Sequence, residues 1–86
     1  MGESAGQLAL RLRTHAKSFT FADLKRVCEH YFGGSRQKGT SHLVFKTGIA
    51  TPALVNIQSQ GKMAKPYQCR QVAEAIAAKT GIEIPR

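Results

Sequence analysis

The sequence predicts an α+β fold in which two helices cover one face of a three-stranded antiparallel sheet. Three observations lead to this fold class. The chain has 86 residues, which suits one domain. Two stretches, beginning near residues 20 and 66, carry apolar residues at helical spacing. Between them, apolar and polar residues alternate over short stretches, as in strands that bury one face. The expected order is helix, three strands, helix, with the other face of the sheet open to water.

The first of the two helices is expected to begin after Thr20, whose hydroxyl can accept a hydrogen bond from the first turn. Apolar residues then recur at helical spacing on one face, namely Leu24, Val27, Cys28 and Tyr31. Gly33 follows the last of them and can end the helix. Before this helix, residues 7–17 are expected to form a short helix. We therefore divide the chain into an N-terminal extension, residues 1–18, partly flexible or helical, and a domain of residues 19–86.

The strands are expected at residues 35–38, 41–46 and 53–59. In the second stretch, Leu43 and Phe45 fall on one face, so strand alternation assigns His42 and Lys46 to the open face or its rim. The closing helix is expected to start near Pro66 and to end at Gly81. Its apolar stripe consists of Cys69, Val72 and Ile76, widened by Ala73 and Ala77.

The charge of the chain is strongly positive and unevenly placed. Thirteen Lys and Arg residues face five Asp and Glu residues, which gives a formal charge of +8. No acidic residue lies between Glu29 and Glu74. That interval contains Arg36, Lys38, Lys46, Lys62, Lys65 and Arg70. A solvated face would explain the basic residues alone, but the lack of compensating acids favours a phosphate-binding surface. RNA or another nucleic acid is the first candidate partner, and an anionic membrane surface is the second.

Several classes of protein are excluded by the composition. No apolar run is long enough to span a membrane, and the N-terminus lacks the apolar segment of a secretory signal. Two cysteines and three histidines without close spacing argue against a structural zinc, and neither common nucleotide-binding loop occurs. We therefore expect no metal and no cofactor. Cys28 and Cys69 are expected to be reduced core residues of a cytoplasmic protein.

His42 is the candidate for chemistry, because it lies in the basic stretch on a predicted strand. A histidine can act as a general acid or base near neutral pH. Beside RNA, it can take the proton from a 2′-hydroxyl, whose oxygen then attacks the adjacent phosphorus while lysines stabilise the charge on the phosphate. The alternative interpretation is a histidine on the sheet face with no chemical role.

Three segments of the chain resemble the HicA family of toxins from bacterial type II toxin–antitoxin systems. The first is Phe19-Thr20-Phe21-Ala22-Asp23-Leu24. The second is Lys38-Gly39-Thr40-Ser41-His42-Leu43-Val44-Phe45, similar to the family's K-G-S-H-H-x-x-F segment. The third is Gly61-Lys62-Met63-Ala64-Lys65-Pro66-Tyr67-Gln68-Cys69-Arg70-Gln71-Val72, close to the family's G-x-x-x-K-P-Y-Q-V-R-Q-V variant. The resemblance implies a fold like that of double-stranded-RNA-binding domains, an endoribonuclease that cleaves mRNA, and neutralisation by a HicB-type antitoxin.

The chain departs from the family where the family has Gly-Ser-His-His, since here Gly39 is followed by Thr40, Ser41, His42 and Leu43. Aligning Ser41 and His42 with the family's Ser-His keeps His42 on the open face, whereas a shift of one residue would move the histidine to the other face. With this alignment the resemblance implies that His42 is catalytic.

The residues expected to bind RNA phosphates are Lys38, Thr40, Ser41, Lys46, Lys62, Lys65 and Arg70. Tyr67 can stack on a base or pack against the sheet. Two alternatives remain for the function as a whole. The same basic face suits a non-catalytic RNA-binding module, and its charge also suits an interaction domain for an acidic protein.

Overall fold

The computed structural model describes residues 3–35 and 42–86, which form helices and one sheet. Helix α1 (Ala5–Ala9) and the 3-10 helix η1 (Ala16–Ser18) precede helix α2 (Phe21–Phe32). Strands β1 (His42–Lys46), β2 (Leu54–Gln60) and β3 (Met63–Ala64) follow, and helix α3 (Pro66–Thr80) comes after them. From α2 onward the order is the predicted helix, three strands, helix.

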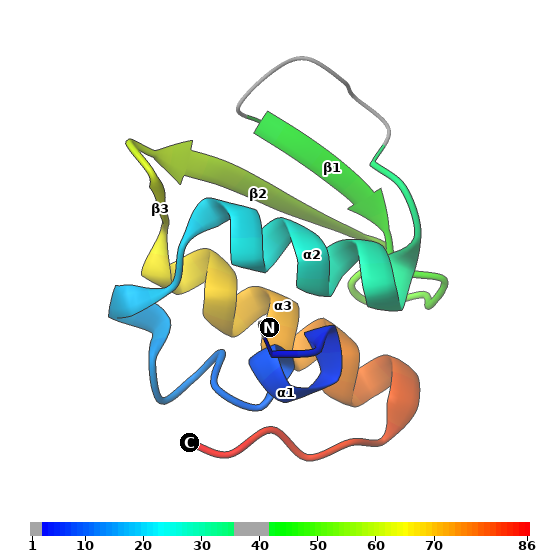
Figure 1. The fold of residues 1–86 in the computed structure, drawn as a ribbon. Coiled ribbons are helices and arrows are strands. Elements are labelled where there is room, and N and C mark those ends of the chain that lie inside the picture. The colour runs from blue at the N-terminus through cyan, green and yellow to red at the C-terminus, as the bar shows by residue number, and fades with distance from the viewer. Residues whose placement is uncertain (1–2, 36–41) are drawn as a thin grey trace.

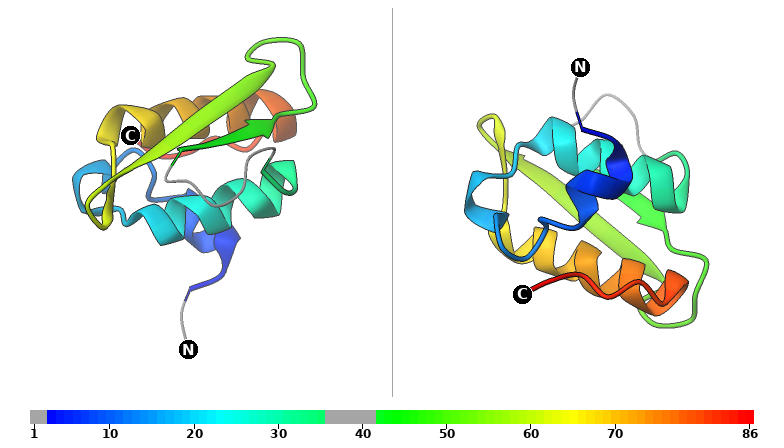
Figure 2. Two further views of the ribbon diagram at one scale, coloured as in Figure 1. Left: turned by 90° about the horizontal axis from the view of Figure 1, so that it is seen from above. Right: turned by 60° about the horizontal axis from the view of Figure 1, so that its bottom comes forward.

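The three strands form one antiparallel sheet in the order β1-β2-β3. Helices α2 and α3 lie side by side beneath one face of it, and the other face is open (Figures 1 and 2). The predicted α+β fold with both helices on one face is therefore confirmed. Within the described residues, no helix has the length and apolar character needed to cross a membrane.

The core lies between the sheet and the two helices. Because side chains alternate along a strand, every second residue of β1 and β2 contributes to it. The side chains that β1 and β2 turn inward are Leu43, Phe45, Val55 and Ile57, all buried. The helices supply the buried residues Leu24, Val27, Cys28, Cys69, Val72, Ala73 and Ile76. Each helical stripe predicted from apolar spacing therefore points into one shared core, although Tyr31 and Ala77 are only partly buried.

Local signals fix the ends of both long helices. The hydroxyl of Thr20 accepts a hydrogen bond from the backbone N–H of Asp23 at 3.1 Å, which caps α2 as predicted. Helix α3 starts at Pro66, where the missing N–H leaves no helical bond unmade. Gly81 ends α3 with φ 78°, a left-handed conformation that glycine adopts without strain.

One of the three strands is not where the sequence predicted it. Ser35 is not in a strand, and the rest of the predicted strand at residues 35–38 lies outside the described residues. The strand that pairs with the second edge of β2 is Met63–Ala64, where Ala64 pairs with Ser59 and Met63 with Gln60. The backbone N–H of Ala64 also donates to the carbonyl of Phe19 at 2.9 Å. Two residues cannot show alternation, and one of the partners that hold this strand, Phe19, is distant in sequence.

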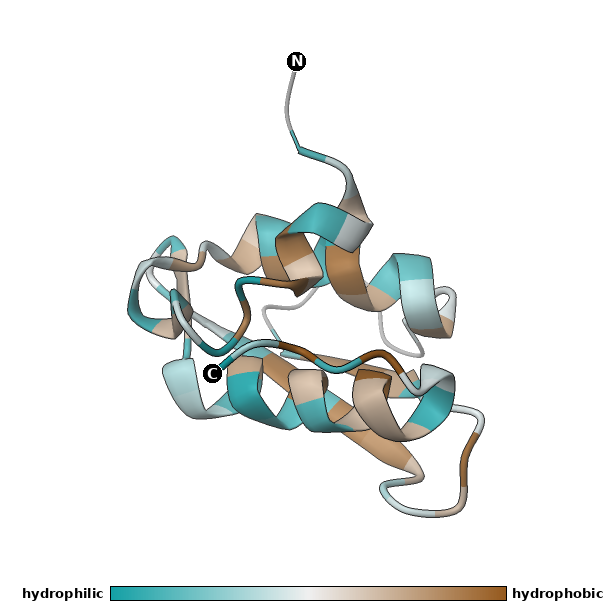
Figure 3. Ribbon diagram, turned by 90° about the horizontal axis from the view of Figure 1, so that it is seen from below, coloured by the Kyte–Doolittle hydropathy of each residue, from teal (hydrophilic) through white to brown (hydrophobic). Residues whose placement is uncertain are grey.

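The N-terminal segment differs from the single helix expected at residues 7–17. Helix α1 ends at Ala9, and the backbone N–H groups of Leu10 and Leu12 donate to carbonyls three residues earlier, which tightens the chain into turns. Leu8 and Leu12 nevertheless lie in the same core cluster as α2 and α3. Seen from below, the N-terminal segment and the C-terminal tail lie over the two helices, and both carry apolar stretches (Figure 3).

We predict that Leu12→Ala lowers the free energy of unfolding by about 2–5 kcal/mol, because it opens a cavity in a fully buried site. Leu10→Ala is the matched control, since Leu10 lies two residues away and is 44% exposed. Urea unfolding of both variants measures the difference. Equal, small losses in the two variants would show that the segment before Phe19 contributes nothing to the core.

Candidate nucleic-acid interface

Strand β1 places His42 on the open face of the sheet. Along this strand the residues alternate between exposed and buried, so Leu43 and Phe45 enter the core while His42 and Lys46 remain exposed. The prediction of the face for His42 and Lys46 is therefore confirmed. An exposed imidazole on an open face is accessible to a long, flexible molecule such as RNA.

His42 belongs to a row of three polar side chains that crosses the sheet. The register pairs His42 of β1 with Gln58 of β2. Paired residues on one face of an antiparallel sheet have Cβ atoms about 4.5–5.5 Å apart, so these two side chains are neighbours. On the other side of Gln58, the Lys65 ammonium donates to the Gln58 Oε1 atom at 3.0 Å. We call His42, Gln58 and Lys65 the sheet-face row. In this row, the imidazole of His42 lies on one side of the Gln58 side chain and the positive charge of Lys65 on the other.

The start of α3 is locked to the sheet at this row. Gln68 is almost fully buried, and its Oε1 atom accepts a hydrogen bond of 2.7 Å from the backbone N–H of Gln58. Its Nε2 atom donates to the Tyr67 hydroxyl at 3.4 Å. Tyr67 is 48% exposed, so part of its ring is accessible for stacking on a base. The helix start therefore fixes Lys65 and Tyr67 relative to His42.

The remaining predicted phosphate-binding residues do not all join the sheet-face row. Lys46 shares the open face with His42 but lies four residues along β1, about 13 Å away at the rise of a strand. Lys62 is exposed in the turn between β2 and β3. Arg70 lies on α3 beside residues 13–18 rather than beside the row. Lys38, Thr40 and Ser41 lie outside the described residues.

Few acids neutralise the basic side chains. Across residues 3–35 and 42–86, the structure has two ion pairs, Arg11 with Glu3 at 2.5 Å and Arg26 with Asp23 at 3.9 Å. Neither pair involves the central basic residues Lys46, Lys62, Lys65 or Arg70. Their charges are consequently not neutralised within the described part of the chain, and they are able to attract phosphates.

The cysteines lie away from this surface and are poor nucleophiles. Both are free and fully buried. Burial raises the pKa of the Cys69 thiol to about 11, although the nearby charge of Arg70 lowers it. Burial, followed by the influence of Cys69 and Glu29, raises the pKa of the Cys28 thiol even further. Both groups are therefore thiols at neutral pH, and the reactive thiolate is scarce. Among the described residues, no three His, Cys, Asp or Glu side chains gather into a possible metal site.

Three pockets that are lined by described residues lie apart from His42. Two shallow pockets flank Arg13 and Arg70, and a third, of about 420 Å³, lies between the start of β2 and α3. His42 lines none of these three. The sheet-face row lies on the face of the sheet away from the core, and such a face suits a polymer better than a small ligand.

Two residues of the site, Gln58 and Gln68, were not singled out from the sequence. Alternation in β2 does place Gln58 away from the core. Gln68 precedes Cys69 and lies four residues before Val72, so its position belongs to the apolar stripe of the helix, and it is buried. A buried side-chain amide normally has a hydrogen-bond partner, and this is the sequence signal that could have identified Gln68.

Comparisons of the chain with protein-family models, with curated proteins and with solved structures find no match.

We predict that Gln68→Ala lowers the free energy of unfolding by about 1–3 kcal/mol, because it leaves the part-buried N–H of Gln58 without its acceptor. Hydrogen exchange at the Gln58 amide should accelerate in the same variant. Gln71→Ala, an exposed change on the same helix, is the control. Unchanged exchange at Gln58 in the Gln68 variant would show that this bond does not hold α3 to the sheet.

Proposed function

We propose that this protein is an endoribonuclease that cleaves mRNA and arrests translation, as the toxin of a type II toxin–antitoxin system. The observation that carries the proposal is the sheet-face row, in which an exposed histidine and a lysine flank one glutamine on an open, basic surface. The resemblance of three segments to the HicA family supports the same activity. It also supports a HicB-type antitoxin as the protein partner and the bacterial cytoplasm as the location.

The row contains the groups that cleavage of RNA by internal attack requires. Neutral His42 takes the proton from a 2′-hydroxyl, and the 2′-oxygen attacks the adjacent phosphorus. The bond from phosphorus to the 5′-oxygen breaks, and the departing oxygen takes a proton from the imidazolium or from water. Lys65 stabilises the negative charge that grows on the phosphate oxygens. Because proton transfer and charge stabilisation suffice for this route, the proposed reaction is independent of metal ions.

The positioning of the substrate is assigned to the neighbours of the row. Tyr67 stacks on a base at the start of α3. Lys46 and Lys62 contact phosphates farther along the RNA. The contribution of Lys38, Thr40 and Ser41 rests on the sequence and on the resemblance. An open sheet face suits single-stranded RNA, whose bases are available for stacking.

The second candidate function is an RNA-binding module without catalysis. It is favoured by the bond between Lys65 and Gln58, since a lysine held on an open face can bind phosphate without any chemistry at His42. Both functions predict RNA binding that weakens with salt. They differ in whether the bound RNA is cut.

We expect His42→Ala to lower the rate of RNA cleavage by about 10²–10⁴-fold, the usual contribution of a general acid or base. The measurement is cleavage of an end-labelled RNA by purified protein, with and without EDTA. His30→Ala is the control, since His30 is an exposed histidine on α2. Circular dichroism should be unchanged in both variants, because both side chains are exposed.

Each result of this experiment decides one part of the proposal. Full cleavage by the His42 variant would overturn the catalytic role of His42, and loss of cleavage in EDTA would overturn independence from metal. RNA binding without cleavage by the parent protein would favour the non-catalytic module.

A further inference from the structure

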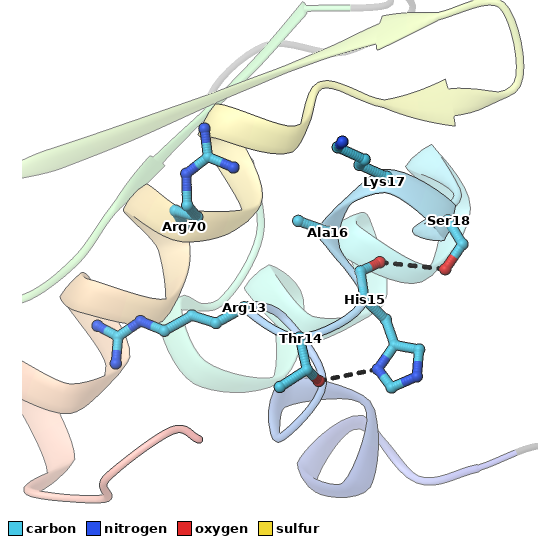
Figure 4. Close-up of a pocket in the computed structure, with 7 residues that line it drawn as sticks. All are labelled: Arg13, Thr14, His15, Ala16, Lys17, Ser18 and Arg70. Atoms are coloured by element: carbon cyan, nitrogen blue, oxygen red, sulfur yellow. Dashed lines mark hydrogen bonds between the residues drawn. The ribbon is translucent and has the colours of Figure 1, made fainter. Parts of the chain in front are cut away.

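A second basic surface lies on the side of α3 that faces the N-terminal segment. A pocket of about 330 Å³ is lined by residues 13–18 and Arg70. An adjoining pocket of about 260 Å³ is lined by Arg13, Arg70, Glu74 and Arg86. The two pockets share Arg13 and Arg70 in their lining, so they lie next to each other, and together they are here called the α3 groove. Figure 4 shows that Arg70 extends from α3, while the other residues of the first pocket come from the preceding segment.

Positive charge predominates in the α3 groove. Arg13, Lys17, Arg70 and Arg86 line it, against one acid, Glu74. In the part of the chain that the structure describes, the side chains of Arg70 and Lys17 make no hydrogen bond or ion pair. Like charges gathered in one depression repel one another, and an anion bound between them would relieve this repulsion.

The fold holds one of these guanidinium groups in place before any ligand arrives. The Nη1 atom of Arg13 donates to the carbonyl of Ile84 at 3.0 Å, and Ile84 is buried. A guanidinium group has five N–H donors, so this bond leaves most of the N–H groups of Arg13 available to another acceptor. The wall of the groove is also held by internal bonds, since Ser18 donates to the carbonyl of His15 at 3.2 Å and Thr14 is bonded to the His15 ring at 2.8 Å (Figure 4).

The groove and the sheet-face row each include a residue near the start of α3. Lys65 is the residue just before this helix, and its ammonium bonds to Gln58 on the sheet side. Arg70 follows five residues later on the groove side. Five residues of helix correspond to about 7.5 Å along its axis. An RNA strand that crosses the start of α3 can therefore contact both surfaces.

We infer that the α3 groove binds a backbone phosphate of the same RNA that occupies the sheet face, so that the RNA path continues from the row across the start of α3. This inference rests on the proposed binding of RNA. Phosphate is favoured over the carboxylates of an acidic protein because Arg70 lies only five residues after Lys65, so one RNA strand can reach both side chains. The arginines suit it as well, because their forks bind phosphate oxygens in pairs.

The test measures binding of a 2′-O-methyl RNA strand, which lacks the attacking hydroxyl and so cannot be cut by the proposed route. Affinity is measured over a range of salt for the parent protein and for Arg70→Gln and Lys17→Gln. Lys25→Gln removes one charge from the exposed side of α2 and is the matched control. Each groove variant should bind more weakly than the control, and its slope of log affinity against log salt should fall by about 0.7.

The possible failures are distinguishable. If the parent binds RNA and the groove variants match Lys25→Gln, the groove inference is wrong and the proposed function stands. If the parent binds no RNA, both are overturned. If Arg70→Gln weakens binding of polyglutamate but not of RNA, the groove receives an acidic protein, and the inference is likewise overturned.

Discussion

The pairing of β1 with β2 is the constraint on which the rest of the structure depends. His42 faces Gln58 in this register, and the next pair along, Leu43 with Ile57, enters the core. Side chains alternate strictly along a strand, so a slip of one residue would bury His42 and expose Phe45. The apolar residues that stabilise the fold therefore also determine which polar residues reach the open face.

Helix α3 connects the core to both basic surfaces. Its buried face packs under the sheet through Cys69, Val72 and Ile76, and Gln68 bonds its first turn to the backbone of β2. This fixed start holds Lys65 on the sheet side and Arg70 on the opposite side. The N-terminal segment then completes the α3 groove with Arg13 and Lys17, after burying Leu8 and Leu12 in the common core.

The parts of this structure that follow local rules could be predicted from the sequence. The cap at Thr20 and the alternation around Leu43 and Phe45 depend on near neighbours, so the start of α2 and the face of His42 were predictable. Strand β3 was not, because its two residues are held by Phe19 and by β2. The position of Arg70 also escaped prediction, since the way α3 packs against residues 13–18 is decided by the tertiary fold. A charge count places Arg70 among the phosphate-binding residues but cannot assign it to a face.

The proposed function and the α3 groove together require that RNA binds across the open sheet face and the start of α3. Nuclear magnetic resonance of the labelled protein, titrated with 2′-O-methyl RNA, tests it most directly. RNA bound along this path should shift the amides of His42 and Val44, the side-chain amide of Gln58, and residues 65–70. Shifts confined to the exposed side of α2, around Lys25 and Glu29, or the absence of any shift, would contradict it.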